Sequence, residues 1–331
     1  MKQIPLYPLR FDPIYQYRLW GGRRLSDMLS APLPEDVPIG EAWVLSDRDD
    51  HSSQVANGPL KGLTISELME AYQKPLMGKW ASCFKRFPLL LKFLDAEEML
   101  SVQVHPSDAH RDLIPADDSG KTEAWVVIDA HKDSLIYAGL KPGTTDEIEL
   151  RESLANGTVT DHLAGITPKP GDGVFIPAGT VHTLGGGVVV FEVQQNSDVT
   201  FRLYDWGHVD PKTGQPRSLH VDQALACIDF AGIAGGLVAP HVETASPVER
   251  ERLFDCEHFR LYRLLGEAPF PVGAANEPHV LICIAGAGRI EHHDLPYGVG
   301  KGDVWILPAE AGECVFRPSE EITLLEIKIP G

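Results

Sequence analysis

The sequence predicts a mainly β protein built from two related β units with a few helices. Short runs in which apolar and polar residues alternate recur along the chain, and turns separate them. The 31 glycines and 26 prolines supply those turns. Helical patterns are few and do not alternate regularly with the strands, so a sandwich or barrel is favoured over a parallel doubly wound sheet.

Composition narrows the class of protein further. The chain has 331 residues, 43% of them hydrophobic and 23% charged, which are values of a globular protein. Its formal charge of −18 argues against nucleic-acid and anionic-membrane binding, because both need an exposed basic field. No uncharged apolar stretch approaches the ~18 to 20 residues that span a bilayer, and the first residues lack an apolar signal core. We therefore expect a cytoplasmic protein, present as a monomer or a homodimer.

The five cysteines form no CxxC pair, and five is an odd number. A zinc ribbon, a redox motif and a disulfide framework are therefore all disfavoured. We expect reduced and mostly buried thiols.

The first half of the chain alternates strand patterns with one clear helix. Leucine and methionine recur at helical spacing in residues 64–72, where Thr64 and Glu67 can form a capping box. Residues 123–129 and 134–138 are expected to pair as two strands. The other expected strands of this half are 41–46, 87–95 and 100–105.

The second half begins with a helix at 146–155 and continues with a long β stretch and another helix at 222–228. The run 231–240 is rich in small residues and predicts a linker. We accordingly expect one domain over residues 1–235 and a smaller β domain over 236–331. The expected strands are 173–176, 180–184, 188–194, 199–204 and 322–329.

An internal echo supports two related units. The segment from Gly171 to Pro177 and the segment from Gly302 to Pro308 share a glycine, an aspartate, an apolar run and a proline six residues after the glycine. Five residues after its proline the first copy has His182, where the second has a glutamate. Only the first unit therefore keeps a histidine at this place.

Four residues could form a metal site. Gln103 and His105 lie two apart on an expected strand, so they share one face about 6.6 Å apart at ~3.3 Å per residue. Glu123 begins another strand, and His182 ends a Pro-x-Gly-x-x-His turn. A mixed set of imidazole, carboxylate and amide donors suits Zn²⁺ in an open site, with Mn²⁺, Co²⁺ or Fe²⁺ as chemical substitutes. The alternative is that both histidines are ordinary polar strand residues.

The Gly171-x5-Pro177-x-Gly179-x2-His182 segment resembles the second signature of cupins, which hold an ion inside a small β-barrel. This resemblance implies two cupin-like units of jelly-roll or β-barrel form, the second lacking the ligand histidine. The first cupin signature has a closely spaced His-x-His. Here Gln103 takes the first of those places, so the site is a variant.

A series of motifs runs in order from Trp20 to Arg202. It includes Gly40-Glu-Ala-Trp43, Leu100-Ser-Val-Gln-Val-His-Pro-Ser-Asp108 and Lys121-Thr-Glu-Ala-Trp125. Together these motifs resemble the type I mannose-6-phosphate isomerases (phosphomannose isomerases), in particular the shorter bacterial form. One departure is that longer members often carry His-Lys-Pro-Glu, where this chain has Gly120-Lys-Thr-Glu123.

The resemblance implies a zinc-dependent, reversible isomerisation of mannose 6-phosphate and fructose 6-phosphate through a cis-enediol(ate). A phosphorylated hexose is then the expected partner. The implied zinc ligands are His105, Glu123 and His182, with Gln103 as a fourth. The implied catalytic groups are Arg202 and Lys121, with Glu192 and Asp198 as candidates for proton transfer or positioning; the candidates for substrate binding are Trp20, Ser101 and Lys92.

Other interpretations remain open at this point. The chain could be a metal-dependent cupin oxygenase, or a sugar-phosphate-binding protein without turnover. Lys92 could be the buried partner of an acid, and Arg202 could pair structurally with Asp198 or Asp205. Trp43 is expected to be a core aromatic residue. The adjacent His292 and His293 are expected in a solvated turn, because neighbouring strand residues point to opposite faces.

Overall fold

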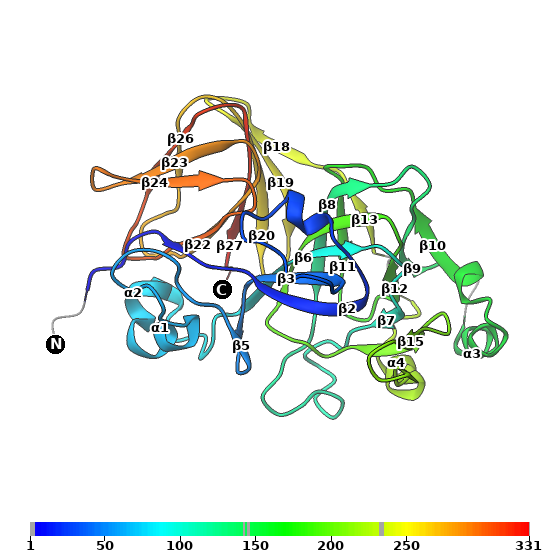
Figure 1. The fold of residues 1–331 in the computed structure, drawn as a ribbon. Helices are drawn as coiled ribbons and strands as arrows, with labels where there is room; N and C mark the ends of the chain where they lie inside the picture. The colour runs from blue at the N-terminus through cyan, green and yellow to red at the C-terminus, as the bar shows by residue number, and fades with distance from the viewer. Residues whose placement is uncertain (1–3, 142, 144–145, 232–234, 331) are drawn as a thin grey trace.

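The computed structural model describes residues 4–141, 143, 146–231 and 235–330. The described chain is mainly β, as predicted, and Figure 1 shows two β units side by side. Each unit consists of a seven-stranded antiparallel sheet facing a smaller antiparallel sheet. The fold class inferred from the alternating patterns is therefore confirmed.

The first unit holds the residues singled out above. Its seven-stranded sheet has the order β17-β11-β8-β13-β6-β2-β3, and its five-stranded sheet the order β10-β9-β12-β7-β14. The larger sheet comprises β2 (Ile14–Gly22), β3 (Ile39–Leu45), β6 (Leu89–Ala96), β8 (Glu123–Ala130), β11 (Gly173–Ile176), β13 (Val188–Gln195) and β17 (Gly236–Val238). The smaller sheet comprises β7 (Val102–Val104), β9 (Ile136–Leu140), β10 (Leu163–Ile166), β12 (His182–Leu184) and β14 (Phe201–Tyr204).

The second unit repeats this plan. Its sheets have the orders β1-β25-β22-β27-β20-β19-β18 and β21-β26-β23-β24. The larger sheet comprises β1 (Leu9–Arg10), β18 (His241–Thr244), β19 (Glu249–Asp255), β20 (Arg260–Gly266), β22 (His279–Ala285), β25 (Val304–Leu307) and β27 (Ile322–Lys328). The smaller sheet comprises β21 (Phe270–Val272), β23 (Ala287–His292), β24 (Leu295–Gly300) and β26 (Cys314–Pro318).

The two seven-stranded sheets share one apolar core. Phe93 and Phe191 of the first unit belong to the same buried cluster as Leu261 and Ile306 of the second. Since side chains alternate along a strand, the residues next to these phenylalanines lie on the opposite face of their sheet. That opposite face lies toward the five-stranded sheet, and there the first unit forms its polar cavity.

The units also exchange short strands. The early strand β1 pairs with β25 of the second unit, and β17 pairs with β11 of the first. Part of the expected linker at 231–240 therefore forms a strand, while residues 232–234 lie outside the described residues. The division after residue 235 stays a prediction.

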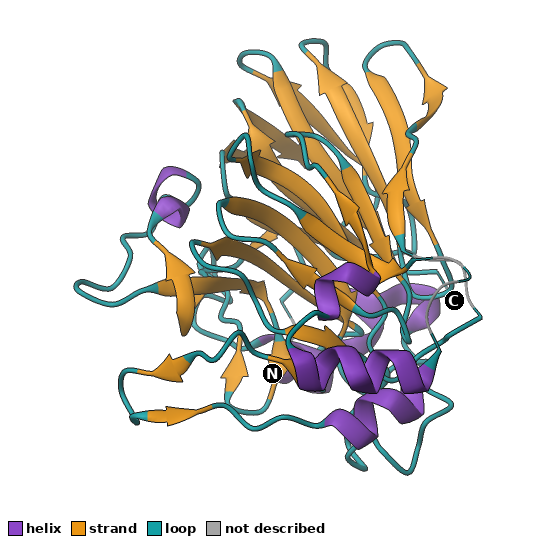
Figure 2. Ribbon diagram, turned by 90° about the vertical axis from the view of Figure 1, so that its right-hand side faces the viewer, coloured by secondary structure: helices purple, strands orange, loops and turns teal. Residues whose placement is uncertain are grey.

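The helices confirm the local patterns. Helix α1 (Ile65–Ala71) begins after Thr64, and the capping box with Glu67 is present. Helices α3 (Glu147–Asn156) and α4 (Val221–Cys227) match the other two predictions, while α2 (Gln73–Met77) has no counterpart among them. Most helical segments lie at one end of the sheets (Figure 2). None of the helices in the described ranges is long and apolar enough to cross a membrane.

One expected pairing is wrong. The segments 123–129 and 134–138 form β8 and β9, but these strands lie in different sheets. Strand β8 pairs with β11 and β13, whereas β9 pairs with β10 and β12. The intervening turn carries the chain from one sheet to the other, so sequence neighbours are not hydrogen-bonded neighbours here.

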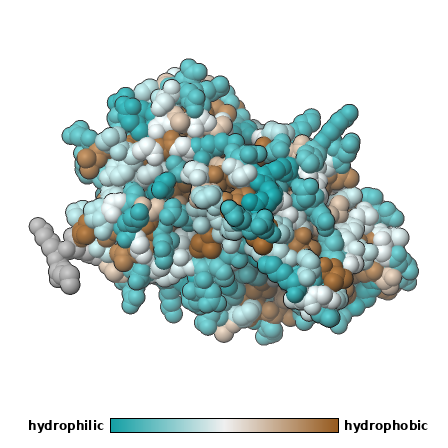
Figure 3. Space-filling view, in the orientation of Figure 1, coloured by the Kyte–Doolittle hydropathy of each residue, from teal (hydrophilic) through white to brown (hydrophobic). Residues whose placement is uncertain are grey.

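The surface and the thiols complete the description. All five cysteines are free, and Cys227, Cys283 and Cys314 are buried, in agreement with the prediction. On the face shown in Figure 3, hydrophobic residues lie in small groups among hydrophilic ones. The exposed large hydrophobic residues, such as Ile148 and Leu237, are few.

Candidate active site

Three of the predicted metal ligands meet between the sheets of the first unit. Glu123 is the first residue of β8, His182 is the first residue of β12, and His105 follows the last residue of β7. All three side chains are at most 1% exposed. Their ligand atoms lie within 4.8 Å of one another, and they form the one such group of three found among the described residues.

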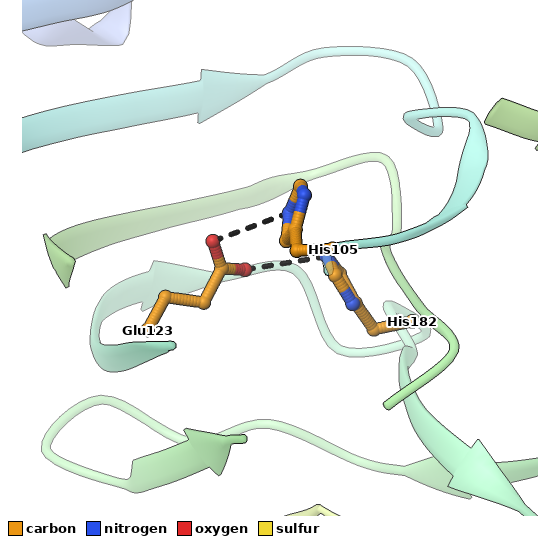
Figure 4. Close-up of side chains that lie close together, drawn as sticks. All are labelled: His105, Glu123 and His182. Atoms are coloured by element: carbon orange, nitrogen blue, oxygen red, sulfur yellow. Dashed lines mark ion pairs between the residues drawn. The ribbon is translucent and has the colours of Figure 1, made fainter. Parts of the chain in front are cut away.

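The carboxylate faces both imidazoles (Figure 4). Glu123 Oε2 is 3.4 Å from His105 Nε2, and Glu123 Oε1 is 3.2 Å from His182 Nε2. Neither buried carboxylate oxygen accepts a hydrogen bond of good geometry. Glu123 Oε2 has the Lys121 ammonium 2.9 Å away, whereas Oε1 has no hydrogen-bond donor among the described residues, which indicates a place for an ion.

The histidine nitrogens support the same conclusion. His105 Nδ1 lies 2.8 Å from the Val199 carbonyl, and His182 Nδ1 lies 2.9 Å from the Thr180 carbonyl. A carbonyl only accepts hydrogen bonds, so each Nδ1 carries the proton and each Nε2 keeps a lone pair. Burial, together with the Lys121 charge, lowers the pKa of His105 to about 3, and burial also lowers the pKa of His182. Neutral imidazoles with outward Nε2 atoms are fit to hold a metal ion.

Gln103 lies beside this group. It is opposite His182 in the strand register, and its Nε2 is 3.2 Å from His182 Nε2. Its Oε1 accepts a hydrogen bond from the Ser101 hydroxyl at 3.3 Å. Coordination through the amide oxygen therefore requires the amide to turn by 180°.

Lys121 is buried against the same cluster. Its Nζ lies 2.9 Å from Glu123 Oε2 and 3.0 Å from His105 Nε2. Burial acts to lower the pKa of Lys121, but the Glu123 and Glu192 charges outweigh it and the pKa is raised. The ammonium is therefore a fixed positive charge rather than a base.

A polar cavity of about 390 Å³ adjoins the cluster. Along one wall, Lys92 Nζ lies 3.3 Å from Glu192 and 3.8 Å from Glu41. The Trp125 indole donates to Glu192 at 2.8 Å. Burial raises the pKa of Glu192, against the lowering effect of Lys92. The lining contains every predicted catalytic and substrate-binding residue, namely Trp20, Lys92, Ser101, Lys121, Glu192, Asp198 and Arg202.

Arg202 is placed by β14, opposite Gln103 on β7. Its Nε donates to the Ser101 hydroxyl at 3.2 Å, and its Nη1 donates to the Ser218 carbonyl at 2.8 Å. The proposed pairing with Asp205 is wrong, because Asp205 accepts from Arg217 through both carboxylate oxygens. Within the described residues, Arg202 forms no ion pair with Asp198 either.

Sequence reasoning missed several lining residues. Arg18 forms two hydrogen bonds to Glu41, at 3.0 and 3.1 Å, and Trp43 donates to the same carboxylate at 2.6 Å. Trp43 is thus both buried, as expected, and part of a polar network. A signal was available for Glu41, because a glutamate at the start of an otherwise apolar strand needs a buried partner. The other missed polar lining residues are Thr200, Arg217 and His220.

The adjacent histidines near the C-terminus match their prediction in part. His293 lies in the turn after β23 and has a left-handed φ of 47°. His292 is the last residue of β23 and is buried at 8% exposure. The expectation of a solvated position is therefore wrong for His292, because the strand extends through it and turns its side chain inward.

The second unit has a buried histidine, His279, at the position that corresponds to Glu123 of the first unit. In the first unit β11 pairs with β8 so that Ile176 faces Glu123, and in the second β25 pairs with β22 so that Leu307 faces His279. His279 thus takes the place of Glu123. Its Nδ1 lies 2.7 Å from the buried Glu326. The two similar sequence segments, Gly171 to Pro177 and Gly302 to Pro308, therefore also occupy the same strand register in their units.

Comparisons with known proteins agree with this geometry. A family model described as the catalytic domain of type I phosphomannose isomerase matches residues 9–138. The probable mannose-6-phosphate isomerase GmuF of Bacillus subtilis is 36% identical, over 96% of this chain and 98% of its own. Mannose-6-phosphate isomerase ManA of the same organism is also 36% identical, over 92% of this chain and 94% of its own.

Structural comparison agrees. The crystal structure of mannose 6-phosphate isomerase from Bacillus subtilis superposes with a TM-score of 0.89 at 31% identity, covering 97% of this chain and 99% of that one. Both the sequence and the fold therefore match over nearly the whole length. The chain belongs to the type I phosphomannose isomerase family.

Proposed function

We propose that the protein catalyses the zinc-dependent, reversible isomerisation of mannose 6-phosphate and fructose 6-phosphate through a cis-enediol(ate) intermediate. The observation that carries this proposal is the buried His105–Glu123–His182 group, which opens onto a cavity lined by fixed cations and a carboxylate of raised pKa. Membership of the family supplies the substrate class.

The residues that would hold the metal are His105, Glu123 and His182, with Gln103 as a fourth donor once its amide is turned. Two imidazoles, a carboxylate and an amide oxygen suit Zn²⁺, and Mn²⁺, Co²⁺ or Fe²⁺ are chemical substitutes. A bound divalent ion would polarise the substrate oxygens near the reacting carbons.

Proton transfer between C2 and C1 needs a base beside the cavity. Glu192 is the best placed, because its Oε1 accepts no hydrogen bond of good geometry and burial raises its pKa. The Trp125 and Lys92 contacts fix its carboxylate. Asp198 is the alternative proton-transfer or positioning group; it is exposed and lines the same cavity.

The negative charge that develops on the enediolate oxygens needs fixed positive partners. Lys121 and Arg202 supply this positive charge from two sides of Gln103. Lys121 contacts His105, and Arg202 donates a hydrogen bond to the Ser101 hydroxyl. Such preorganised charges lower the barrier because they need no rearrangement during the reaction.

The remaining lining residues are proposed to bind substrate. Trp20 presents a buried aromatic wall at 3% exposure, Ser101 offers a hydroxyl beside Arg202, and Lys92 is a cation at 3% exposure. A cytoplasmic location and a monomeric or homodimeric state stay predictions.

A coupled assay for fructose 6-phosphate formed from mannose 6-phosphate tests the proposal. Activity should fall on chelation and return when Zn²⁺ is added back. A metal-loaded protein without turnover would contradict it. Oxygen uptake with bound iron would then favour the oxygenase alternative, and tight sugar-phosphate binding without turnover would favour the sensor alternative.

A further inference from the structure

A group of basic side chains lines the cavity beyond Ser101. Arg202 lies on β14, while Arg217 and His220 lie in the segment between β16 (Gln215–Pro216) and α4. The charges act on one another. Burial lowers the pKa of Arg202 most, and the Arg217 charge lowers it further; likewise burial and then the Arg202 charge lower the pKa of His220. We call Arg202, Arg217 and His220 the basic group.

Each member of the basic group has a side-chain N–H group that makes no hydrogen bond within the described residues. Arg202 uses Nε and Nη1 on neutral oxygens, and Arg217 uses Nε and Nη2 on Asp205. His220 Nδ1 accepts from the backbone N–H of Arg202 at 3.3 Å, so the ring proton is on Nε2. Within the described ranges, Arg202 Nη2, Arg217 Nη1 and His220 Nε2 make no hydrogen bond.

Charge is not balanced at this end of the cavity. Asp205 neutralises Arg217 and leaves Arg202 without a carboxylate partner among the described residues. On the other wall, by contrast, Arg18 and Lys92 are offset by Glu41 and Glu192. The exposed Asp198 also lines this cavity, and its charge acts on Arg18 and on Lys121.

The basic group is connected to the metal-ligand group through Ser101. Ser101 Oγ bridges Gln103 and Arg202, with contacts of 3.3 and 3.2 Å. Arg217 and His220 line the same cavity next to Arg202, whose backbone N–H donates to His220 Nδ1 and whose guanidinium is influenced by the Arg217 charge. A substrate with its carbonyl end at the ligands would therefore extend its other end toward these two residues.

We propose that Arg217 and His220, together with Arg202, form the subsite that binds the phosphate group of the sugar phosphate. Three unpaired N–H groups from three side chains match the three terminal oxygens of a phosphate monoester, and the excess positive charge matches its negative charge. The assignment rests on the proposed isomerase function. It separates the roles of the cations: Lys121 acts at the reacting carbons, Arg217 and His220 act at the phosphate, and Arg202 lies next to both, between Ser101 and Arg217.

The test uses the zinc-loaded full chain and two substitutions, Arg217→Gln and His220→Gln. Inorganic phosphate is the probe in calorimetric titrations, and kcat and KM are measured with mannose 6-phosphate. Losing one charge-assisted hydrogen bond is expected to weaken phosphate binding and raise KM by about tenfold or more for Arg217→Gln, with a smaller effect on kcat. Arg217→Lys should recover part of the affinity.

The controls separate a binding role from a structural one. Lys132→Gln removes one positive charge from the exposed turn between β8 and β9 and should leave both quantities unchanged. His220→Gln leaves the Arg217–Asp205 pair intact, so it tests the subsite even if Arg217→Gln unfolds. Unchanged phosphate affinity and unchanged KM in His220→Gln and in a folded Arg217→Gln protein would overturn the subsite.

The subsite and the reaction can fail separately. Phosphate titration needs no turnover, so a protein without isomerase activity can still show weakened phosphate binding in Arg217→Gln. That result would keep the subsite and overturn the proposed reaction. Isomerase activity together with phosphate binding that neither substitution changes would keep the proposed reaction and overturn the subsite.

Discussion

Replacing the buried Glu326 of the second unit by glutamine is expected to destabilise the protein by about 3 kcal/mol at pH 7. Glu326 is 2% exposed and accepts hydrogen bonds from Arg250 at 2.7 Å and from the Gly273 N–H at 3.1 Å, with His279 Nδ1 2.7 Å away. Burial acts to raise its pKa, but His279 and Arg250 outweigh burial and lower the pKa from 4.5 to about 2. At 1.36 kcal/mol per pKa unit, that difference corresponds to about 3 kcal/mol.

The pH dependence has a definite sign. Because the folded pKa lies below the unfolded one, the carboxylate contributes its full stability above pH 4.5 and loses it as the pH falls toward 2. The difference in unfolding free energy between the wild-type protein and Glu326→Gln should therefore be largest at pH 7. It should shrink to about half by pH 3.

Urea unfolding followed by fluorescence at pH 7 and at pH 3 measures this difference. Glu257→Gln is the matched control, because Glu257 is exposed in the same unit and its loss should change the unfolding free energy by less than about 0.5 kcal/mol. The reasoning is refuted if Glu326→Gln costs no more than Glu257→Gln. It is equally refuted if the cost is the same at both pH values.

Two further predictions concern local structure. Gly185→Ala should lower the unfolding free energy by about 3 kcal/mol, because a Cβ there would lie 1.9 Å from the Leu135 carbonyl oxygen. Gly236→Ala is the control, because a Cβ at Gly236 meets nothing within 4 Å. Equal thermal melting temperatures of the two variants would contradict this prediction. Thr64→Ala should cost about 1 kcal/mol in thermal unfolding by removing the cap of α1. Thr158→Ala should cost less, since the Thr158 side chain caps no N–H of its short helix, and an equal cost would show that the capping box is not the cause.

Features set by local chemistry could be predicted from the sequence. The capping box predicted at Thr64 depends on a side chain three residues from its partner, and it is present. A second capping box at Asp146, which was not predicted, forms in the same way. The Gln103-x-His105 spacing puts two donors on one face of one strand for the same reason. The Pro177-x-Gly179-x2-His182 turn likewise fixes where its histidine begins the next strand.

Features set by distant pairing could not be predicted. Nothing near 123–138 reveals that β8 and β9 enter different sheets, because that depends on which strands later compete for their edges. The same holds for β1, which crosses to the second unit. The cavity network shows the limit most clearly, since Arg18 meets Glu41 and Arg217 reaches the cavity only through tertiary folding.

Metal content measured together with turnover tests the central claim most directly. His182→Ala removes one proposed ligand, Arg202→Ala removes a cation without touching the ligands, and His241→Ala alters an exposed histidine of the second unit. Elemental analysis of the purified proteins should find zinc in the wild type, in Arg202→Ala and in His241→Ala, but not in His182→Ala. Turnover of mannose 6-phosphate should survive only in the wild type and His241→Ala. Full zinc and full activity in His182→Ala would contradict the account.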